Sequence, residues 1–369
     1  MQRCHRQREI AGELRKQIVQ GRYPPGARIP PHVAIERQYH SSTVTVQRAL
    51  NRLVAEGFLV ARGQRGTYVV DKPPHLHHYG LLFPTSRTES WGQFHVALYH
   101  EAIKANADSC RLSCFFALPE PANLANYSQL VELAQSHQLA GLIFTFIPQA
   151  LVGTPLIDQT DMPRVGIWTP GRFSFPSVFP DYETFFRKAV NHLQSRGRQR
   201  VALLALGPEI AVHCAEFRTA LARSNITTRP YWLQCAGMGS VAARQCMHLL
   251  MHGNQTERPD GLIIADDNLV EPATAGLVDA GVRVPDDMDV VAHANFPWQP
   301  SSLVPAKFLG FDTRQILRVC IQTIDMQRQG RVPPRLTVVP PVFDDEADMG
   351  QTVSDQIGWT HDGARPETG

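Results

Sequence analysis

The chain has 369 residues, of which 43% are hydrophobic and 19% charged, so we expect two or three globular domains rather than a disordered chain. It contains no run of about 18 apolar residues and no apolar stretch behind its basic N-terminus, which argues against a membrane span and against export. Seven scattered cysteines without a CxxC pair predict neither a disulfide framework nor a zinc site, and they fit a reducing cytoplasm.

Charge is concentrated at the N-terminus. Residues 1–70 carry twelve Lys or Arg against four Asp or Glu, a net charge of +8, whereas the whole chain has only +2. A compact cationic segment can neutralise phosphates and release their counterions, so this pattern favours contact with a nucleic acid.

The order of residues in this basic segment predicts three helices and a hairpin. Apolar residues repeat with helical spacing over 10–20, and a second helix is expected over 31–39. A third helix is expected over 43–56, capped by Ser41 or Ser42, ended by Gly57, and burying a stripe of Val46, Ala49, Leu50 and Leu53. Short strands over 58–62 and 67–70, joined by a tight turn at 63–66, complete a winged helix-turn-helix (α+β).

The third helix and the hairpin are the parts expected to contact double-stranded DNA. The helix can enter the major groove with its N-terminus first, and the hairpin can approach the backbone or the minor groove. The expected DNA-binding residues are Thr43, Val44, Thr45, Gln47, Arg48 and Arg52 of the helix and Arg65 and Gly66 of the hairpin.

Several motifs align without a gap to one family of DNA-binding domains. They include PPGARIP (24–30), Arg48-Ala49-Leu50, Glu56-Gly57 and GQRGTYV (63–69). With these motifs, residues 10–70 resemble the DNA-binding domain of the gluconate-repressor (GntR) family. That family usually has arginine where this chain has Thr43 and Gln47, and Ser-Glu-Arg where it has 31–33, so the resemblance implies DNA binding with a different operator. Gln47 has the groups to read adenine by two hydrogen bonds.

After a short proline-containing linker (71–78), strand-like and helix-like segments alternate through a body that we place at residues 79–343. This alternation predicts an α/β fold with doubly wound parallel sheets in two lobes, and a ligand cleft at the carboxyl ends of the strands. The linker is expected to act as a hinge and its histidines to be solvated, and the polar segment 344–369 is expected to be disordered. The expected strands are 79–83, 112–117, 140–146, 164–168, 200–205, 261–265 and 290–293, and the expected helices 92–107, 127–137, 182–196, 215–224, 241–252 and 271–281.

Three stretches of the body share their sequence pattern with a family of sugar sensors. They run from Asp181 to Ala202, through RPDGLIIADDNL (258–269), and through AGVRVPDDMDVVAHAN (280–295). By these stretches the body resembles the sensor domain of the lactose/galactose-repressor (LacI/GalR) family, which is related to periplasmic binding proteins. The resemblance implies a sugar-like effector between the lobes.

Candidate effector contacts follow from the aligned motifs and from residue chemistry. His213 stands where the family has an arginine, and Asp266, Asn295 and His213 are predicted as polar groups at strand ends. Three aromatic side chains are candidates for stacking on a sugar face. The complete set of expected ligand-binding residues is Trp91, Phe94, Trp168, Asp181, His213, Asp266 and Asn295.

The leading hypothesis is a ligand-responsive transcriptional regulator, expected to act as a repressor. It would bind a palindromic operator as a homodimer in the cytoplasm, associated with the nucleoid, without a cofactor or metal. The alternative is a cytoplasmic solute-binding protein with a degenerate head. An enzyme is not expected, because no nucleophile–base arrangement accompanies the adjacent carboxylates Asp266 and Asp267.

Overall fold

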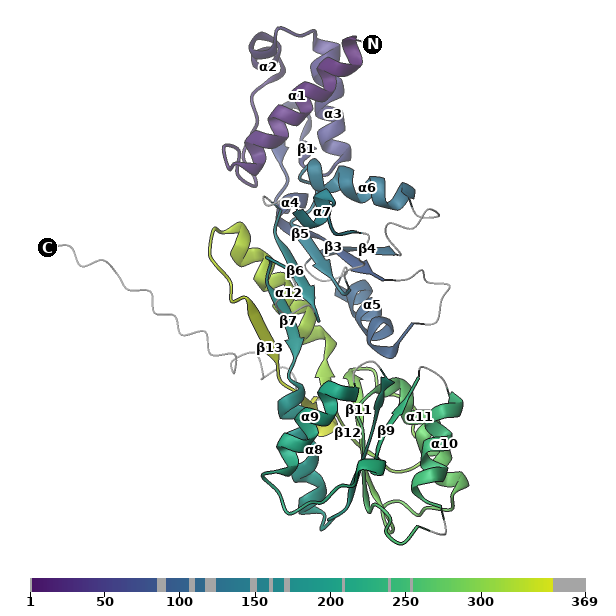
Figure 1. The fold of residues 1–369 in the computed structure, drawn as a ribbon. Coiled ribbons are helices and arrows are strands. Elements are labelled where there is room, and N and C mark those ends of the chain that lie inside the picture. The colour runs from purple at the N-terminus through teal and green to yellow at the C-terminus, as the bar shows by residue number, and fades with distance from the viewer. Residues whose placement is uncertain are drawn as a thin grey trace, which may run out of the picture. The chain divides into compact units, whose positions relative to one another are not determined.

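The computed structural model describes residues 2–84, 91–105, 110–116, 124–146, 151–158, 162–168, 173–207, 210–237, 240–252 and 255–347. By its internal contacts the chain divides into two units (Figure 1). The first unit consists of residues 1–179 and 314–338, and the second of residues 180–313 and 339–369. The expected disordered tail therefore lies outside the described residues from 348 onward.

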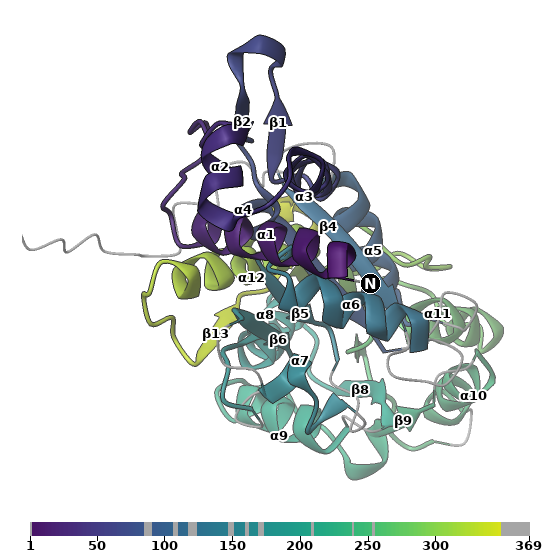
Figure 2. The same cartoon turned by 90° about the horizontal axis from the view of Figure 1, so that it is seen from above.

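The first unit begins with a winged helix-turn-helix, called the head below. Its elements are α1 (Gln2–Val19), α2 (His32–Tyr39), α3 (Thr43–Ala55), β1 (Leu59–Ala61), the 3-10 turn η1 (Gly63–Arg65) and β2 (Thr67–Val69). The predicted stripe of α3 is buried, with no member more than 2% exposed, and it packs on Ile10 and Leu14 of α1. The antiparallel hairpin β1–β2 projects beyond the three helices (Figure 2).

Helix α1 starts eight residues earlier than its apolar pattern predicts. Its first turns, QRCHRQRE, have no apolar stripe, so hydrophobic spacing could not reveal them. The Arg6 side chain donates a hydrogen bond of 2.6 Å to the carbonyl of Tyr39, which ties this early part of α1 to the end of α2.

The linker contains the one-turn helix α4 (Pro74–His77) and the first residue of β3 (His78–Phe83). The prediction of solvated histidines is wrong for two of the three. The His75 ring stacks on Phe58 at 5.8 Å, and His78 is 6% exposed and lies 2.8 Å from the Ser113 hydroxyl. Burial lowers the pKa of each of these two side chains to about 4.

The first lobe is built on a six-stranded sheet with the order β13-β7-β6-β5-β3-β4. Neighbouring strands from β4 to β7 pair in parallel, as predicted. Its remaining elements are β4 (Arg111–Phe116), β5 (Gly141–Phe144), β6 (Arg164–Ile167), β7 (Ser177–Pro180), β13 (Leu336–Val339), α5 (Gln93–Ala105), α6 (Leu124–Gln135), α7 (Pro155–Asp158) and α12 (Thr313–Arg328).

Helix α12 comes from late in the sequence and packs on strands of this first sheet. The Gln327 amide donates to the Arg164 carbonyl of β6 at 2.8 Å and accepts from its N–H at 3.1 Å. The Tyr79 hydroxyl of β3 donates to Asp325 at 2.9 Å. Gly141 leaves room for Ile324, since a Cβ at residue 141 would lie 2.6 Å from the Ile324 side chain.

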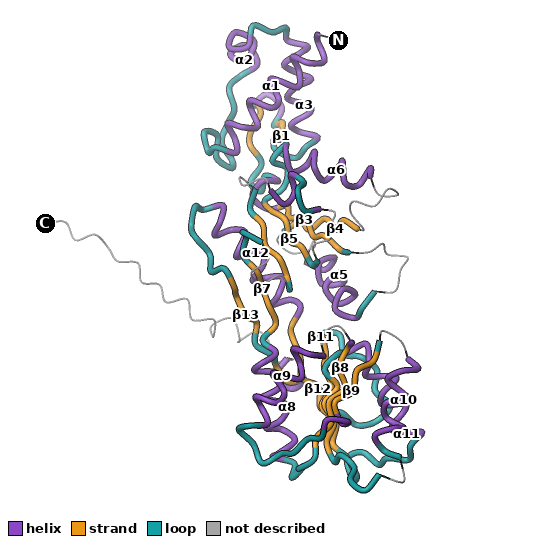
Figure 3. Tube along the Cα trace, viewed as in Figure 1, coloured by secondary structure: helices purple, strands orange, loops and turns teal. Residues whose placement is uncertain are grey.

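The second lobe has its own six-stranded sheet, with the order β14-β12-β11-β10-β8-β9. All pairs are parallel except β12 with β14. Helices α8 and α9 cover one face of the sheet, and α10 and α11 cover the other (Figure 3). The elements are α8 (Tyr182–Ser195), β8 (Val201–Leu206), α9 (Ile210–Leu221), η5 (Pro230–Trp232), β9 (Leu233–Ala236), α10 (Ser240–Leu250), β10 (Gly261–Ile264), η6 (Asp267–Leu269), α11 (Val270–Asp279), β11 (Asp289–Phe296), β12 (Lys307–Asp312), β14 (Val342–Phe343) and α13 (Asp344–Ala347).

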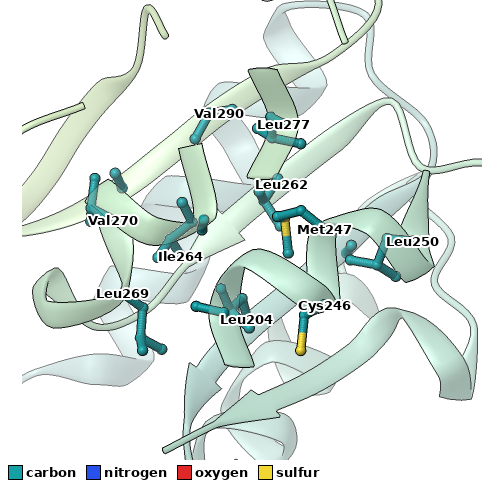
Figure 4. Close-up of a cluster of buried hydrophobic side chains, with 14 of the residues drawn as sticks. Leu204, Cys246, Met247, Leu250, Leu262, Ile264, Leu269, Val270, Leu277 and Val290 are labelled. Atoms are coloured by element: carbon teal, nitrogen blue, oxygen red, sulfur yellow. The ribbon is translucent and has the colours of Figure 1, made fainter. Parts of the chain in front are cut away.

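A hydrophobic cluster joins the sheet of the second lobe to α10 and α11. Leu204, Leu262 and Ile264 from the strands meet Met247 of α10 and Leu277 of α11, all fully buried (Figure 4). Side chains of this kind contribute about 1.5–3 kcal/mol each on burial, so this cluster holds the α10–α11 layer on the sheet. The predicted fold class, a winged helix-turn-helix followed by two lobes of parallel sheet, is confirmed.

Candidate functional site

Polar and apolar side chains lie exposed on the outward face of α3. Val44 is 60% exposed, and Thr43, Gln47, Arg48 and Asn51 are exposed as well. The amide of Gln47 donates a hydrogen bond of 2.8 Å to the Asn51 carbonyl oxygen, one turn along the helix. Asn51 was not among the predicted contacts, although its spacing from Gln47 places it on the same face.

Other predicted residues at the start of α3 are used differently. Ser42 occupies the N-cap position, but its hydroxyl lies 3.0 Å from the Thr45 hydroxyl and makes no capping bond to the backbone. Thr45 is half-buried and contacts Ser42, whereas Thr43 is exposed.

The turn of the hairpin holds Gly66 against Arg28. Gly66 has φ of +101°, a backbone conformation that favours glycine, and a Cβ there would lie 2.8 Å from the Arg28 side chain, which would have to move. Beside it Arg65 is exposed, and Tyr68 donates a hydrogen bond of 3.0 Å to the Arg65 carbonyl. The Arg62 guanidinium lies 4.8 Å from the Tyr68 ring centroid. The hairpin therefore carries several cations at a tightly fixed turn.

Arg52, a predicted DNA contact, also serves within the head. Its Nε donates to Glu56 at 2.7 Å, and Arg15 of α1 donates to the same carboxylate at 2.5 Å. Glu56 thus neutralises part of the positive charge on this side of α3. The free cations of the reading face are therefore fewer than the sequence predicts.

The three predicted aromatic residues lie in the first lobe, in two groups. Phe94 of α5 meets the Trp168 ring edge-on at 5.8 Å, and Trp168 also contacts Phe179 at 5.5 Å. Trp91 stacks on Phe83 at 4.9 Å instead. All three side chains are half-buried, so an apolar surface remains accessible at each.

Polar candidates of the second lobe gather at the carboxyl ends of β10 and β11. The Asn295 amide donates to the Asp267 carboxyl at 2.6 Å, and both side chains are buried. Asp266 accepts from the backbone N–H of Asn268 at 2.9 Å and so caps η6. The inward-facing carboxyl is thus Asp267, which the prediction passed over in favour of Asp266.

Burial, reinforced by the neighbouring Asp266 carboxylate, raises the pKa of Asp267 well above its ordinary value. A carboxyl that retains its proton can donate as well as accept hydrogen bonds. Together with the Asn295 amide, it forms a group suited to a hydroxyl-bearing ligand.

Two further candidates have structural roles. Asp181 is the N-cap of α8, where its carboxylate accepts from the Thr184 N–H at 3.0 Å. His213 was predicted at a strand end, and this is wrong, because α9 begins at Ile210 and includes it. The His213 ring is 3% exposed and lies 4.5 Å from the Tyr182 ring.

His293 of β11 is a second buried histidine in this region. It is 4% exposed and surrounded by the rings of Tyr182, Phe185 and Phe311 at 5.7–6.1 Å. Neither ring nitrogen has a hydrogen-bond partner among the described residues. Burial, with a smaller effect from His213, lowers the pKa of His293 to about 3.

Two searches of the described residues bear on other kinds of site. Within these ranges, no group of three or more His, Cys, Asp or Glu side chains is placed to hold a metal ion. No helix there is long and apolar enough to cross a membrane.

Family models match both parts of the chain. Residues 6–69 match the model of bacterial regulatory proteins of the gntR family, and residues 190–343 match that of the periplasmic binding protein-like domain. The chain joins a gntR-family domain to a periplasmic-binding-protein-like domain. Both resemblances predicted from the sequence are thereby confirmed.

Known relatives match different shares of the chain. The transcriptional regulator GmuR of Bacillus subtilis is 37% identical over 71 residues, which cover 18% of this chain and 30% of GmuR. The lactose operon repressor of Escherichia coli is 24% identical over 243 residues, covering 62% of this chain and 64% of the repressor. The chain thus spans less than two thirds of either relative.

A solved structure shares the fold of the periplasmic-binding-protein-like part. The LacI-family regulatory protein from Chloroflexus aggregans superimposes with a TM-score of 0.58 at 18% identity, covering 72% of this chain and 96% of that one.

The enclosure of His293 predicts acid sensitivity of the periplasmic-binding-protein-like domain. Its folded pKa lies below the unfolded value, so its contribution to stability is present above pH 6.5 and declines as the pH falls toward 3. Between pH 7 and pH 5 it is expected to remove about 2 kcal/mol from the free energy of unfolding. The variant His293→Phe should lose that part of the pH dependence, as measured by urea unfolding at both pH values.

The matched change His32→Phe, at a half-buried position of α2 in the head, is expected to leave the difference between pH 7 and pH 5 unchanged. An unaltered pH dependence in His293→Phe would show that this ring does not titrate as its burial requires.

Proposed function

We propose that this protein is a ligand-responsive, non-enzymatic transcriptional regulator, acting as a repressor on operator DNA. The observation that carries the proposal is the exposed face of α3 in a gntR-family domain, on the same chain as a periplasmic-binding-protein-like domain. The names of relatives support it, since GmuR and the lactose operon repressor are both called transcriptional regulators or repressors.

We assign DNA binding to residues 1–70, the linker to 71–78 and ligand sensing to 79–343. The expectation of a disordered tail from residue 344 is wrong for its first four residues, which form α13 (Asp344–Ala347), and the rest of that segment lies outside the described residues. A protein that reads operator DNA acts where the DNA is, so we place it in the cytoplasm on the nucleoid.

The effector proposed is a small carbohydrate. In the second lobe, the paired side chains of Asp267 and Asn295 can bind hydroxyl groups of a ligand. In the first lobe, Phe94 and Trp168 supply aromatic surface. Carbohydrates present both hydroxyls and apolar ring faces, so each set matches one property of the ligand. Four predicted residues remain secondary candidates because each has another role in the structure. Trp91 stacks on Phe83, Asp181 caps α8, His213 is buried within α9, and Asp266 caps η6.

DNA binding should weaken steeply with salt. For a palindromic site selected from random duplexes, we expect the logarithm of the affinity to fall linearly with the logarithm of salt concentration. Arg48→Ala and Arg65→Ala should each reduce that slope by about one, because each removes one phosphate contact. Fluorescence anisotropy titrations at four salt concentrations measure both quantities.

The control is Arg283→Ala, which removes an exposed arginine of the second lobe that is paired with Asp287. It should leave slope and affinity as they are. If selection yields no specific site, the alternative of a solute-binding protein with a degenerate head takes the place of the regulator.

Effector binding should raise the melting temperature. At a ligand concentration 100 times the Kd, the folded state gains about 2.7 kcal/mol, which corresponds to about 5 °C or more for a domain of this size. A thermal-shift screen of pentoses and hexoses tests this. The variant Asn295→Leu should abolish the shift, because it removes the amide partnered with Asp267.

Asn191→Leu is the matched control, since Asn191 is exposed on α8. It should respond to the sugar as the unmodified protein does. Equal shifts in both variants would exclude the Asp267–Asn295 pair from the ligand site.

We also propose a homodimer, with a surface of the second lobe at its interface. A groove of about 690 Å³ between α10 and α11 is lined by Val241, Pro272 and Leu303 beside Arg244 and Glu271. Val241 is 65% exposed and Leu303 is 53% exposed. A twofold interface brings the same patch of both subunits together, and this patch offers apolar residues and both charge signs for such a contact.

Leu303→Glu should therefore shift the protein from the mass of two chains toward the mass of one, because it places a charge in the apolar part of the groove. Sedimentation velocity at micromolar concentration measures the change. Val332→Glu, at a 91% exposed residue outside the groove, is the control and should sediment unchanged. A monomeric unmodified protein would contradict the dimer, and a dimeric Leu303→Glu would contradict this interface.

A further inference from the structure

Two amide side chains, Gln47 and Asn51, form a hydrogen-bonded pair on the exposed face of α3. Gln47 and Asn51 are four residues apart, both are exposed, and Gln47 Nε2 lies 2.8 Å from Asn51 Oδ1. The opposite face of the same helix is buried in the core of the head, so this face has a fixed orientation.

The hydrogen bond fixes which end of the Gln47 amide is the donor. One Nε2 hydrogen is used by Asn51, which leaves the second Nε2 hydrogen and the Oε1 acceptor available. In the major groove adenine offers the N7 acceptor and the N6 amino donor, which match this set. Guanine offers two acceptors, N7 and O6, so the Gln47 oxygen would face the O6 oxygen without a hydrogen between them.

Rotation of the Gln47 amide would offer guanine two N–H donors, but only at the cost of the bond to Asn51. If the Gln47 amide turned by 180°, its oxygen would face the Asn51 oxygen and the bond between them would be lost. The bond is regained only if the Asn51 amide turns as well, so the pair resists a rearrangement that an isolated glutamine makes alone.

We propose that Gln47 reads one adenine in each half of the operator, and that Asn51 is a positioning residue that makes this reading selective against guanine. This inference rests on the proposed function, because it requires that α3 enters the major groove. It adds the base that is read, the base that is rejected, and a residue whose role is exerted through another side chain.

The test uses the full chain and duplexes selected from a random pool. Each A·T pair of the selected site is replaced by G·C in turn, and affinities are measured by anisotropy at constant salt. We expect one symmetric position at which adenine is preferred over guanine by about tenfold, a typical value for a two-bond contact. At that position Gln47→Ala should abolish the preference, and Gln47→Arg should reverse it toward guanine.

Asn51 is tested by two variants that differ in one property. Asn51→Leu removes the acceptor and should reduce the adenine preference to near unity. Asn51→Asp keeps an acceptor at the same place and should retain the preference, although its negative charge lowers affinity for all duplexes. Gln20→Ala, at the exposed residue that follows α1, is the control and should change neither the affinity for DNA nor the preference for adenine.

The outcomes separate the two proposals. Failure to select any specific site would remove the regulator function and this inference together. A specific site at which Gln47→Ala weakens all duplexes equally would overturn base reading by Gln47 but leave the regulator intact. An adenine preference that survives in Asn51→Leu would overturn the positioning role of Asn51.

Discussion

The chain passes between its two units three times, near residues 179, 313 and 338, so neither unit can be completed by a contiguous segment. The first lobe depends on α12 and β13, which follow strands β8 to β12 of the second lobe in the sequence. Gly141 is a direct consequence, because its missing side chain makes room for Ile324 from α12. Removing the late segment would leave the strands β3 and β6 without the partners that Asp325 and Gln327 provide.

The same helix also reaches the linker. Arg328, at the end of α12, donates 2.9 Å to the Leu76 carbonyl of α4 and 2.8 Å to Asp325. On its other side α4 packs on the end of the head, where His75 stacks on Phe58. A segment that composition predicted to be a hinge is therefore held on both sides. Any displacement of α12 must move the Leu76 carbonyl or break this bond, which makes the linker part of the structure rather than a tether.

The sequence predicted elements best where one face is buried uniformly. The runs at β3, β5, β8 and β10 are apolar because helices cover both faces of each sheet, and the stripe of α3 was correct in every member. Strands β7, β9, β12, β13 and β14 were missed, and of these SVFP (β7) and LQCA (β9) are short segments near sheet edges without an apolar run. Helix α12 was not predicted, although Ile316, Cys320 and Ile324 follow helical spacing and are buried. Its membership of the first lobe could not be predicted, because periodicity carries no information about which sheet a helix covers.

The two candidate sites differed in predictability for a related reason. A DNA-reading face is exposed by definition, so the residues left over by the buried stripe of α3 are the site, and only the bond between Gln47 and Asn51 needed coordinates. A ligand site is partly buried, and burial does not say what a polar group faces. Asp266 and Asp267 are adjacent and chemically alike, yet one caps a turn and the other is paired with Asn295 in the interior. The difference arises from the backbone of η6, which turns the first carboxyl toward its own chain and the second toward β11. Because a buried carboxyl is stable only with a partner or a proton, the raised pKa and the Asn295 bond of Asp267 are two results of one placement.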